Sequence, residues 1–142
     1  MRVAGYEVKT VSVDGRTTAL GSAGPFTLVV DRPTDAGGGG QGFNGGQLLN
    51  LAVAGCISND LFREAAATGV TLSRVGVTVM SDYVGDPAVS TAVEYEVELE
   101  GDASEDDLRE LVARVDEIAE IPNSLRRGTE VRLQSVRARS RN

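Results

Sequence analysis

Apolar and polar residues alternate in short runs through the first third of the chain. The alternation predicts strands over Val3–Val13, Arg16–Gly21 and Pro25–Asp31, and Asp14-Gly15 marks a turn between the first two. Short strands that follow one another through tight turns are typical of an antiparallel meander. We therefore expect a small antiparallel sheet at the start of the chain.

A glycine-rich stretch follows these strands. Its residues, Arg32–Gly46 (RPTDAGGGGQGFNGG), include seven glycines and one proline. A glycine-rich run before a helix can bind phosphate through backbone N–H groups. However, neither G-x-x-x-x-G-K-[ST] nor G-x-G-x-x-G after a strand fits the stretch, and no lysine follows it. The stretch therefore predicts a flexible loop.

A long helix is predicted next, with Asn44 as its cap, an end near Thr68 and Gly69 as its terminator. Its first half is apolar on nearly every side, with Leu48, Leu49, Leu51, Ala52, Val53 and Ala54. A helix of that kind is surrounded by protein. Its second half is amphipathic, and its charged residues are expected to be exposed: Asp60, Arg63 and Glu64.

Two long strands joined by a hairpin turn at Asp86-Pro87 are predicted after the helix. Apolar residues alternate in the first strand, and Thr91–Glu100 alternates throughout in the second. The outward residues of the second strand are all glutamates: Glu94, Glu96, Glu98 and Glu100. Glutamates about 7 Å apart on one flat face do not converge on a single cation. The row therefore indicates a solvated face rather than a metal site.

A second helix and a last strand complete the predicted order. Ser104 and Asp107 form a start like a capping box, and apolar residues follow at helical spacing until the helix ends before Pro122. Thr129–Arg139 is predicted as a strand beside the glutamate row, with which its arginines could pair.

The order strands, helix, hairpin, helix, strand has no regular β-α-β alternation, so it indicates an α+β fold. At 142 residues the chain suits one domain, residues 1–142. The first helix is too apolar to be covered by one small sheet. A homodimer would cover the remaining surface of that helix.

The composition is typical of a globular protein, with 41% hydrophobic and 25% charged residues. Because 21 acidic residues face 14 basic ones, the net charge is -7. That charge disfavours non-specific binding to nucleic acid or to anionic membranes. The sequence has neither an apolar leader nor a run of roughly 18 apolar residues. We expect a cytoplasmic protein without nucleic-acid or membrane partners.

Histidine is absent from the chain. Its absence excludes a Ser-His-Asp triad, a Cys-His pair and any metal site built from histidine, and we expect no metal or cofactor. The single cysteine cannot form an internal disulfide. Any chemistry must use that cysteine, arginine, carboxylates or backbone dipoles.

The single cysteine, Cys56, lies in the middle of the predicted long helix. Cysteine is often buried as a small apolar residue, so inert packing is one interpretation. A free thiol has a pKa of about 8.5, and an arginine within about 4–6 Å can lower the pKa of an acidic group by one to three units. The reactive interpretation therefore requires an arginine near Cys56, and the anionic Asp60 would oppose the thiolate.

The segment Asn44–Cys56, NGGQLLNLAVAGC, resembles the N-P-E-x-L-x-x-A-x-x-x-C segment of the OsmC/Ohr family, the osmotically inducible and organic hydroperoxide resistance proteins. Ile121–Ser124, IPNS, falls where that family has its second cysteine in a C-P-x-S-like motif. The predicted order of elements is also the family's order. This resemblance covers nearly the whole chain. It implies an intertwined homodimer, with two central helices buried between antiparallel sheets.

The resemblance also implies a site. Active members reduce organic hydroperoxides, often derived from lipids. By resemblance Cys56 is the residue that attacks the peroxide, and Arg16 is the arginine that holds it as a thiolate. Arg126 and Arg127, beside the IPNS segment, are alternatives for the arginine.

Two positions depart from the family pattern. Gly46 stands where the family has a glutamate that orients the arginine, and Ile121 stands where it has the resolving cysteine. A one-cysteine thiol peroxidase would need an external thiol as reductant. The alternative is a non-catalytic OsmC-fold dimer that binds a small hydrophobic ligand or senses oxidants through Cys56. Ile121 followed by proline would also suit a plain helix end.

Overall fold

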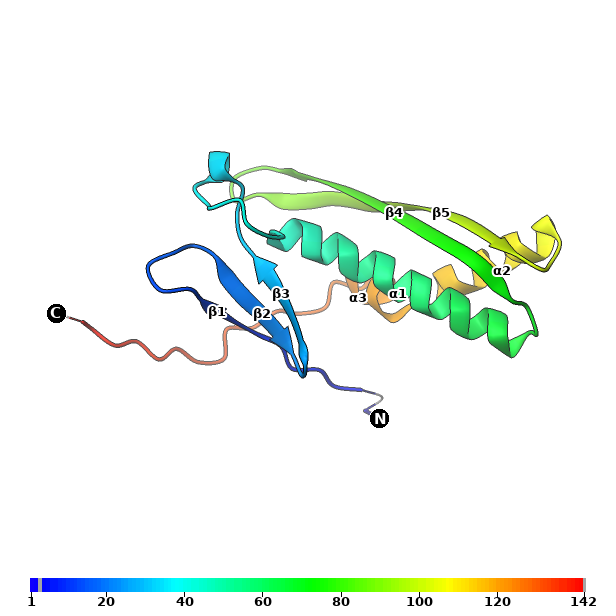
Figure 1. The fold of residues 1–142 in the computed structure, drawn as a ribbon, viewed down its shortest axis with the longest axis horizontal. Helices are drawn as coiled ribbons and strands as arrows, with labels where there is room; N and C mark the ends of the chain where they lie inside the picture. The colour runs from blue at the N-terminus through cyan, green and yellow to red at the C-terminus, as the bar shows by residue number, and fades with distance from the viewer. Residues whose placement is uncertain (3, 142) are drawn as a thin grey trace. The chain divides into compact units, whose positions relative to one another are not determined.

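The computed structural model describes residues 1–2 and 4–141, which contain three α-helices, one 3-10 helix and five strands. Figure 1 shows these elements: β1 Lys9–Ser12, β2 Ala19–Ala23, β3 Phe26–Val30, η1 Thr34–Ala36, α1 Gly45–Ala67, β4 Leu72–Val84, β5 Val89–Gly101, α2 Glu105–Ile118 and α3 Glu120–Arg126. The predicted α+β class is confirmed.

The chain packs as two compact units. The N-terminal unit comprises Met1–Ala52 and Val79–Glu94, and the C-terminal unit comprises Val53–Thr78 and Tyr95–Asn142. The long elements α1, β4 and β5 each contribute to both units. A single domain over residues 1–142 stays a prediction.

The predicted meander is present in the N-terminal unit as the antiparallel sheet β1-β2-β3. Thr10 pairs with Gly21, and Gly21 pairs with Leu28 on the other side. Gly24 makes the turn between β2 and β3 with a φ of 56°, a conformation that favours glycine. The first strand is shorter than predicted, and Val3, where the predicted strand begins, lies outside the described residues.

Asp31, at the end of β3, holds the glycine-rich segment to the sheet. Its buried carboxylate accepts hydrogen bonds from Thr17 Oγ1 at 3.0 Å and Thr18 Oγ1 at 2.7 Å. It also accepts hydrogen bonds from three backbone N–H groups, those of Arg32, Gly39 and Gln41. The hydrogen bond from Thr18, helped by those from Gly39, Arg32 and Thr17, holds the pKa of Asp31 well below its usual range despite burial.

The glycines of this segment allow the backbone to approach itself closely. A Cβ at Gly42 would lie 2.2 Å from the carbonyl oxygen of Val29, and a Cβ at Gly38 would lie 2.1 Å from that of Arg32. The segment also contains the 3-10 helix η1. The structure therefore differs from the predicted flexible loop, because hydrogen bonds to Asp31 fix the path of the chain.

The helix α1 confirms the predicted cap and end. Asn44 Oδ1 accepts the backbone N–H of Gln47 at 2.9 Å, and Gln47 Oε1 accepts that of Asn44 at 3.0 Å, which is a reciprocal capping box. After the helix, Gly69 has a φ of 76°. Within one chain, however, the apolar half is not covered on every side, because Leu51 is 50% exposed.

The prediction that Asp60 is exposed was wrong. Asp60 is buried on α1, where its carboxylate pairs with Arg63 at 3.1 Å. Buried positions recur every four residues along this part of the helix, and Asp60 is adjacent to the fully buried Leu61. The pair with Arg63 compensates the buried charge.

The strands β4 and β5 form a two-stranded sheet joined at Asp86-Pro87, as predicted. Along β5 the residues Val93, Tyr95, Val97 and Leu99 are half-buried, and the four glutamates between and after them are exposed. The glutamate row therefore lies on a solvated face, in agreement with the sequence pattern. Among the residues that the structure describes, no group of three or more metal-binding side chains could hold an ion.

The end of the chain differs from the prediction in two ways. The helix α2 is capped as expected by Ser104 Oγ, which accepts the backbone N–H of Asp107 at 3.1 Å. A further helix, α3, follows and includes Pro122 in its first turn, where the missing N–H of proline is not needed. Residues 129–141 form no strand, and Arg132 pairs with Glu130 at 2.6 Å instead of with the glutamate row.

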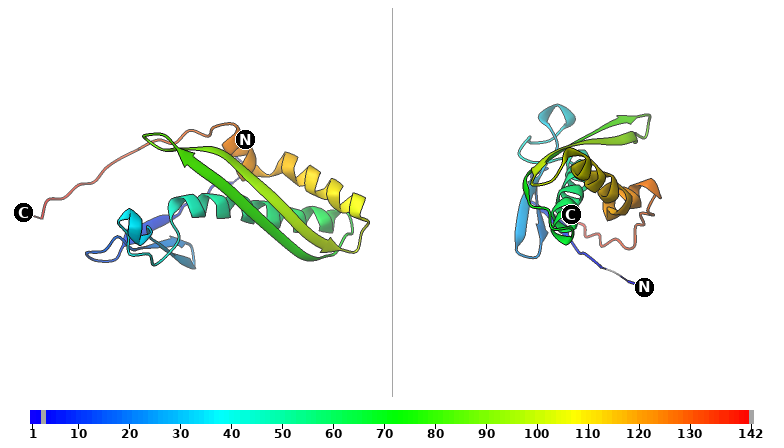
Figure 2. Two further views of the ribbon diagram at one scale, coloured as in Figure 1. Left: turned by 90° about the horizontal axis from the view of Figure 1, so that it is seen from above. Right: turned by 90° about the vertical axis from the view of Figure 1, so that its right-hand side faces the viewer.

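The core of the C-terminal unit lies between α1, α2 and the hairpin strands (Figure 2). Its fully or nearly fully buried residues come from α1, the start of β4, α2 and the α2–α3 junction: Ile57, Leu61, Ala65, Leu72, Leu111, Val115 and Ala119. Side chains of β4 and β5 pack against this cluster from the sheet. This core fixes the part of α1 that carries the single cysteine.

Candidate thiol site

Cys56 is a free, half-buried thiol on α1 in the C-terminal unit. It precedes the fully buried Ile57 and packs against the core cluster without being enclosed by it. Asp60, which could oppose a thiolate, is itself paired with Arg63. The thiol is therefore held against the core of the C-terminal unit and is still partly accessible to solvent.

Arg16 lies in the N-terminal unit, in the turn between β1 and β2, and is exposed. Its backbone N–H donates to the carbonyl of Val13 at 2.9 Å, and the next two residues, Thr17 and Thr18, bind Asp31. The turn is thus held in place while the guanidinium of Arg16 makes no hydrogen bond or ion pair within residues 1–2 and 4–141. Because Arg16 and Cys56 belong to different units, their pairing stays a prediction.

Arg126, an alternative partner for the thiol, is already bound. Its Nη2 lies 2.6 Å from Asp116 Oδ1, and its Nη1 donates to the Asp116 carbonyl at 2.8 Å and to Asn123 Oδ1 at 3.0 Å. The hydroxyl of Tyr95 donates to the same carboxylate oxygen. This cluster links β5, α2 and α3 and engages the Arg126 guanidinium within the C-terminal unit.

The same cluster shifts the pKa values of its members. Burial, together with the hydrogen bond and the charge of Asp116, raises the pKa of Tyr95 to about 12. The hydrogen bond from Tyr95, and then Arg126, lowers the pKa of Asp116. The cluster could not be predicted from the sequence, because Tyr95, Asp116 and Arg126 share no motif and lie on three elements.

Removing the Tyr95 hydroxyl should weaken this link. We expect Tyr95→Phe to lower the free energy of unfolding by about 1 kcal/mol, a modest value because Asp116 is partly exposed and keeps Arg126. Urea unfolding measures the change. Tyr83→Phe is the matched control, since the Tyr83 hydroxyl makes no hydrogen bond among the described residues. Equal effects of both substitutions would contradict a specific role for Tyr95.

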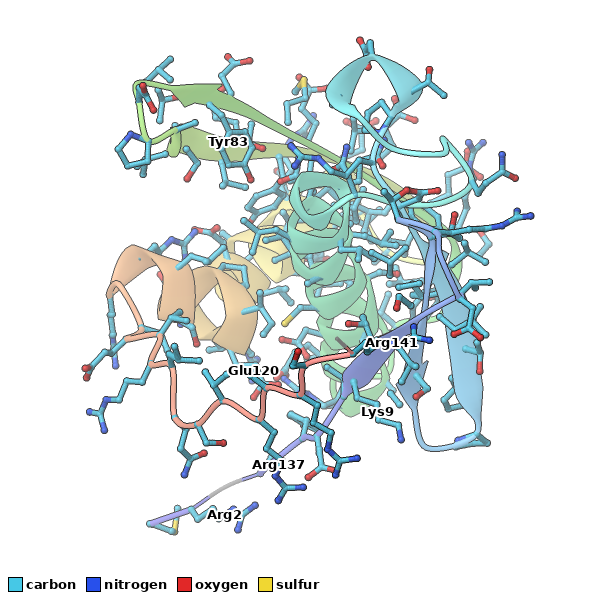
Figure 3. The ribbon with its side chains drawn as sticks, turned by 90° about the vertical axis from the view of Figure 1, so that its left-hand side faces the viewer. Arg2, Lys9, Tyr83, Glu120, Arg137 and Arg141 are labelled. Carbon is cyan, nitrogen blue, oxygen red and sulfur yellow. The ribbon has the colours of Figure 1, made fainter. Side chains whose placement is uncertain are left out.

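The position of the family's glutamate, Gly46, is covered by an aromatic ring. A Cβ at Gly46 would lie 3.4 Å from both Cε2 and Oη of Tyr83, a residue of β4 that Figure 3 labels. Two residues earlier on β4, Ser81 Oγ donates to Asn50 Oδ1, one helical turn beyond Gly46, at 3.0 Å. The first turns of α1 therefore pack on β4, and the Tyr83 ring lies within van der Waals distance of a Cβ at residue 46.

The position of the second cysteine, Ile121, lies in the first turn of α3 and is half-buried beside the buried Pro122. Ser124 Oγ donates to the carbonyl of Glu120 at 2.6 Å within the same short helix. The IPNS segment is therefore a helix start with an apolar residue, and it offers no second thiol.

These observations define an α+β protein with one half-buried thiol on a long, capped helix and no second cysteine. Residues 38–134 match the OsmC-like protein family, so the chain belongs to that family. A search among curated protein sequences gives no match. No helix within the described ranges is both long and apolar enough to cross a membrane.

Solved structures share the fold. The OsmC-like protein of Mycoplasma pneumoniae is 18% identical with a TM-score of 0.77, over 88% of this chain and 89% of that one. The organic hydroperoxide resistance protein OsmC of Legionella pneumophila is 20% identical with a TM-score of 0.61, over 89% and 92%. An organic hydroperoxide resistance protein of Vibrio cholerae with captopril bound in one active site is 23% identical with a TM-score of 0.60, over 89% of each chain.

Proposed function

We propose that the protein is a one-cysteine thiol peroxidase that reduces organic hydroperoxides, including those derived from lipids, with an external thiol. The observation that carries the proposal is the half-buried free thiol of Cys56 on α1, inside the segment that matches the OsmC-like family. The hydroperoxide resistance proteins among the similar structures support the substrate class. With Ile121 in place of a second cysteine, the reductant must come from another molecule.

The reaction balances with two reducing thiols. The Cys56 thiolate attacks one peroxide oxygen, the O–O bond breaks, and the alkoxide leaves as an alcohol after taking a proton, so that Cys56 becomes a sulfenic acid. A first external thiol condenses with the sulfenic acid and releases water. A second external thiol then attacks the mixed disulfide, restores the Cys56 thiol and leaves as a disulfide with the first.

Arg16 is the residue that we propose to stabilise the thiolate. Arg126 is bound to Asp116, whereas the guanidinium groups of Arg16 and Arg127 make no ion pair within the described part of the chain. Of these two, Arg16 is the one that the family resemblance assigns to the thiolate. A cation near Cys56 would raise the thiolate fraction at neutral pH, where a free thiol is only a few per cent ionised.

The proposed setting is a single OsmC-like domain over residues 1–142 that forms a homodimer in the cytoplasm. Exposed apolar residues on α1, namely Leu51 at 50% and Phe62 at 47%, support a partner surface against this helix. A cytoplasmic setting would supply the reducing thiols that the reaction consumes.

The test measures the consumption of cumene hydroperoxide and of hydrogen peroxide by the purified protein with excess dithiol. We expect faster turnover of the organic peroxide and its complete loss in Cys56→Ser. Arg16→Gln should lower the rate at pH 7 by about tenfold or more, because the thiolate fraction falls. Arg109→Gln, at an exposed position of α2 where the arginine pairs with Glu105, is the control and should leave the rate unchanged. Absence of turnover in the unmodified protein would overturn the proposal.

The replacement of both the glutamate and the second cysteine favours a second candidate. Gly46 and Ile121 together suit an OsmC-fold dimer that binds a small hydrophobic ligand or senses oxidants through Cys56 without turnover. A ligand of the folded state would raise the melting temperature. The second candidate predicts such a shift with fatty acids or captopril, or a persistent Cys56 sulfenic acid, and no peroxide consumption.

A further inference from the structure

The carboxylate of Asp31 lies between two segments of the N-terminal unit that are far apart in the chain. The residue is only 3% exposed. Its Oδ1 accepts hydrogen bonds from Thr17 Oγ1 at 3.0 Å and from the backbone N–H of Gly39 at 3.1 Å. Its Oδ2 accepts hydrogen bonds from Thr18 Oγ1 at 2.7 Å and from the backbone N–H of Gln41 at 3.3 Å. Each carboxylate oxygen therefore joins the turn between β1 and β2 to the glycine-rich segment.

Arg16 lies in this turn, directly before the two threonines. Two backbone hydrogen bonds close the turn, from Val13 N–H to the Thr18 carbonyl at 2.8 Å and from Arg16 N–H to the Val13 carbonyl at 2.9 Å. The guanidinium itself makes no hydrogen bond or ion pair within residues 1–2 and 4–141. The place from which the arginine extends is therefore set by the backbone of the turn, which Thr17 and Thr18 tie to Asp31.

The glycine-rich segment leads from Asp31 into α1. The backbone N–H of Asp31 donates to the Phe43 carbonyl at 3.0 Å, and that of Phe43 donates to the Val29 carbonyl at 3.0 Å. The next residue, Asn44, caps the helix by accepting the backbone N–H of Gln47. The same residue that holds the turn therefore also holds the chain where it enters α1.

The turn and the glycine-rich segment meet at Gly39. A Cβ at this position would lie 2.8 Å from Asp31 Oδ2 and 3.3 Å from Thr18 Oγ1, so the backbone passes close to both side chains. Glycine allows this approach because it has no Cβ. Asp31 thus fixes the turn that carries Arg16 against the segment that begins α1, the helix of Cys56.

The chemistry of a carboxylate suits this junction. All five groups that bind Asp31 are donors, namely two hydroxyls and three backbone N–H groups. An ionised carboxylate only accepts hydrogen bonds, whereas an amide of similar shape presents an NH2 group on one side. Asp31 forms no ion pair among the described residues. It therefore holds the turn through neutral hydroxyls and leaves the charge of Arg16 free for another anion.

We propose that Asp31 is the positioning residue that holds Arg16 for the Cys56 thiolate. It contacts neither the thiol nor the peroxide, and it acts by fixing the turn from which the guanidinium extends. Because the backbone is already ordered, less conformational freedom is lost when the arginine pairs with the thiolate. A cation held in this way raises the thiolate fraction at neutral pH. The inference rests on the proposed role of Arg16 and deepens it.

Alkylation by iodoacetamide tests this role, because the thiolate is the reacting species and Cys56 is the only cysteine. The paired substitutions Thr17→Val and Thr18→Val remove both hydroxyls but leave the three backbone hydrogen bonds of Asp31. We expect the pair to slow alkylation at pH 7 by about threefold or more, and to move the pH profile of alkylation upward. In a protein that already carries Arg16→Gln, the pair should change the rate by less than about 1.5-fold, because Asp31 acts through Arg16.

Two further variants separate the hydrogen bonds from a general loss of packing. Thr17→Ser with Thr18→Ser keeps both hydroxyls and should restore most of the alkylation rate. Thr10→Val with Thr27→Val makes the same chemical change at exposed threonines of β1 and β3, whose side chains form no hydrogen bond in the described ranges, and should leave the rate unchanged. Circular dichroism establishes that each variant is folded. If the valine pair does not fold, Thr18→Val alone, which removes only the 2.7 Å hydrogen bond, takes its place.

The outcomes distinguish this role from that of Arg16. If Arg16→Gln slowed alkylation and the valine pair did not, the positioning role of Asp31 would be overturned and the role of Arg16 would stand. Equal slowing by the pair with and without Arg16 would mean a loosened fold and would also overturn the positioning role. If Arg16→Gln left alkylation unchanged, both roles would be overturned. Peroxide turnover by Cys56, measured separately, decides the peroxidase reaction.

Discussion

Replacing Asp31 with alanine is expected to lower the melting temperature by about 10 °C or more. The substitution leaves five donors without their acceptor: the hydroxyls of Thr17 and Thr18 and three backbone N–H groups. Buried donors without an acceptor are costly, and these donors also fix the segment that leads into α1. Thermal unfolding followed by circular dichroism measures the change.

The matched control is Asp35→Ala, which removes the same side chain from an exposed position in η1 only four residues away. It should change the melting temperature by no more than about 2 °C. If the two variants unfolded at the same temperature, the hydrogen bonds to Asp31 would not be organising this segment.

The contribution of Asp31 should also depend on pH. Its folded-state pKa is lowered by the hydrogen bonds it accepts, first that from Thr18, whereas the unfolded value is about 3.9. A lowered folded pKa means that the ionised carboxylate stabilises the fold above about pH 4, and that this stabilisation is lost as the pH falls through the folded pKa. The difference in melting temperature between the unmodified protein and Asp31→Asn should therefore shrink below pH 4.

The sequence predicted the elements whose signals are local. The meander, the capping pair Asn44 and Gln47, the glutamate row of β5 and the Ser104 cap each depend on residues close in the chain. Hydrogen bonds over 13 and 14 residues join Asp31 to Thr18 and Thr17, and no local pattern indicates them. The segment around them was therefore predicted to be a flexible loop.

The last segment, Thr129–Arg139, was predicted as a strand from a local pattern, but it forms none. Its residues have the pattern of a strand, but a strand needs a neighbour, and none is present beside it in the single chain. The helix α2 ends at Ile118, before Pro122 as predicted, but the further helix α3 was missed, because proline is compatible with the first turn of a helix. Pattern alone does not distinguish a proline that starts α3 from one that follows the end of α2.

For the candidate site, as for the fold, the sequence predicted local features but not the contacts between elements. The position of Cys56 on a central helix followed from the sequence, and the structure adds that the thiol is half-buried. No local pattern indicates that Arg126 is bound to Asp116 or that Tyr83 lies beside Gly46, because each contact joins separate elements. The first contact engages the Arg126 guanidinium, and the second places the Tyr83 ring within van der Waals distance of a Cβ at residue 46.

Two leucines on α1 should respond very differently to the same substitution. Leu61 is fully buried in the core of the C-terminal unit, and Leu51, in the N-terminal unit, is 50% exposed. We expect Leu61→Ala to lower the free energy of unfolding by about 2–5 kcal/mol, through lost burial and the cavity it leaves. At low protein concentration Leu51→Ala should cost less than about 1 kcal/mol, because little apolar surface returns to water.

The dependence of these free-energy costs on protein concentration distinguishes packing within one chain from packing between two copies. If α1 is covered by a second copy, as the proposed homodimer requires, the cost of Leu51→Ala should rise with protein concentration as dimers form. The cost of Leu61→Ala should not, because its core is complete within one chain. Urea unfolding over a hundredfold range of concentration measures both. A cost of Leu51→Ala that stays small at every concentration would mean that no partner covers this face of α1.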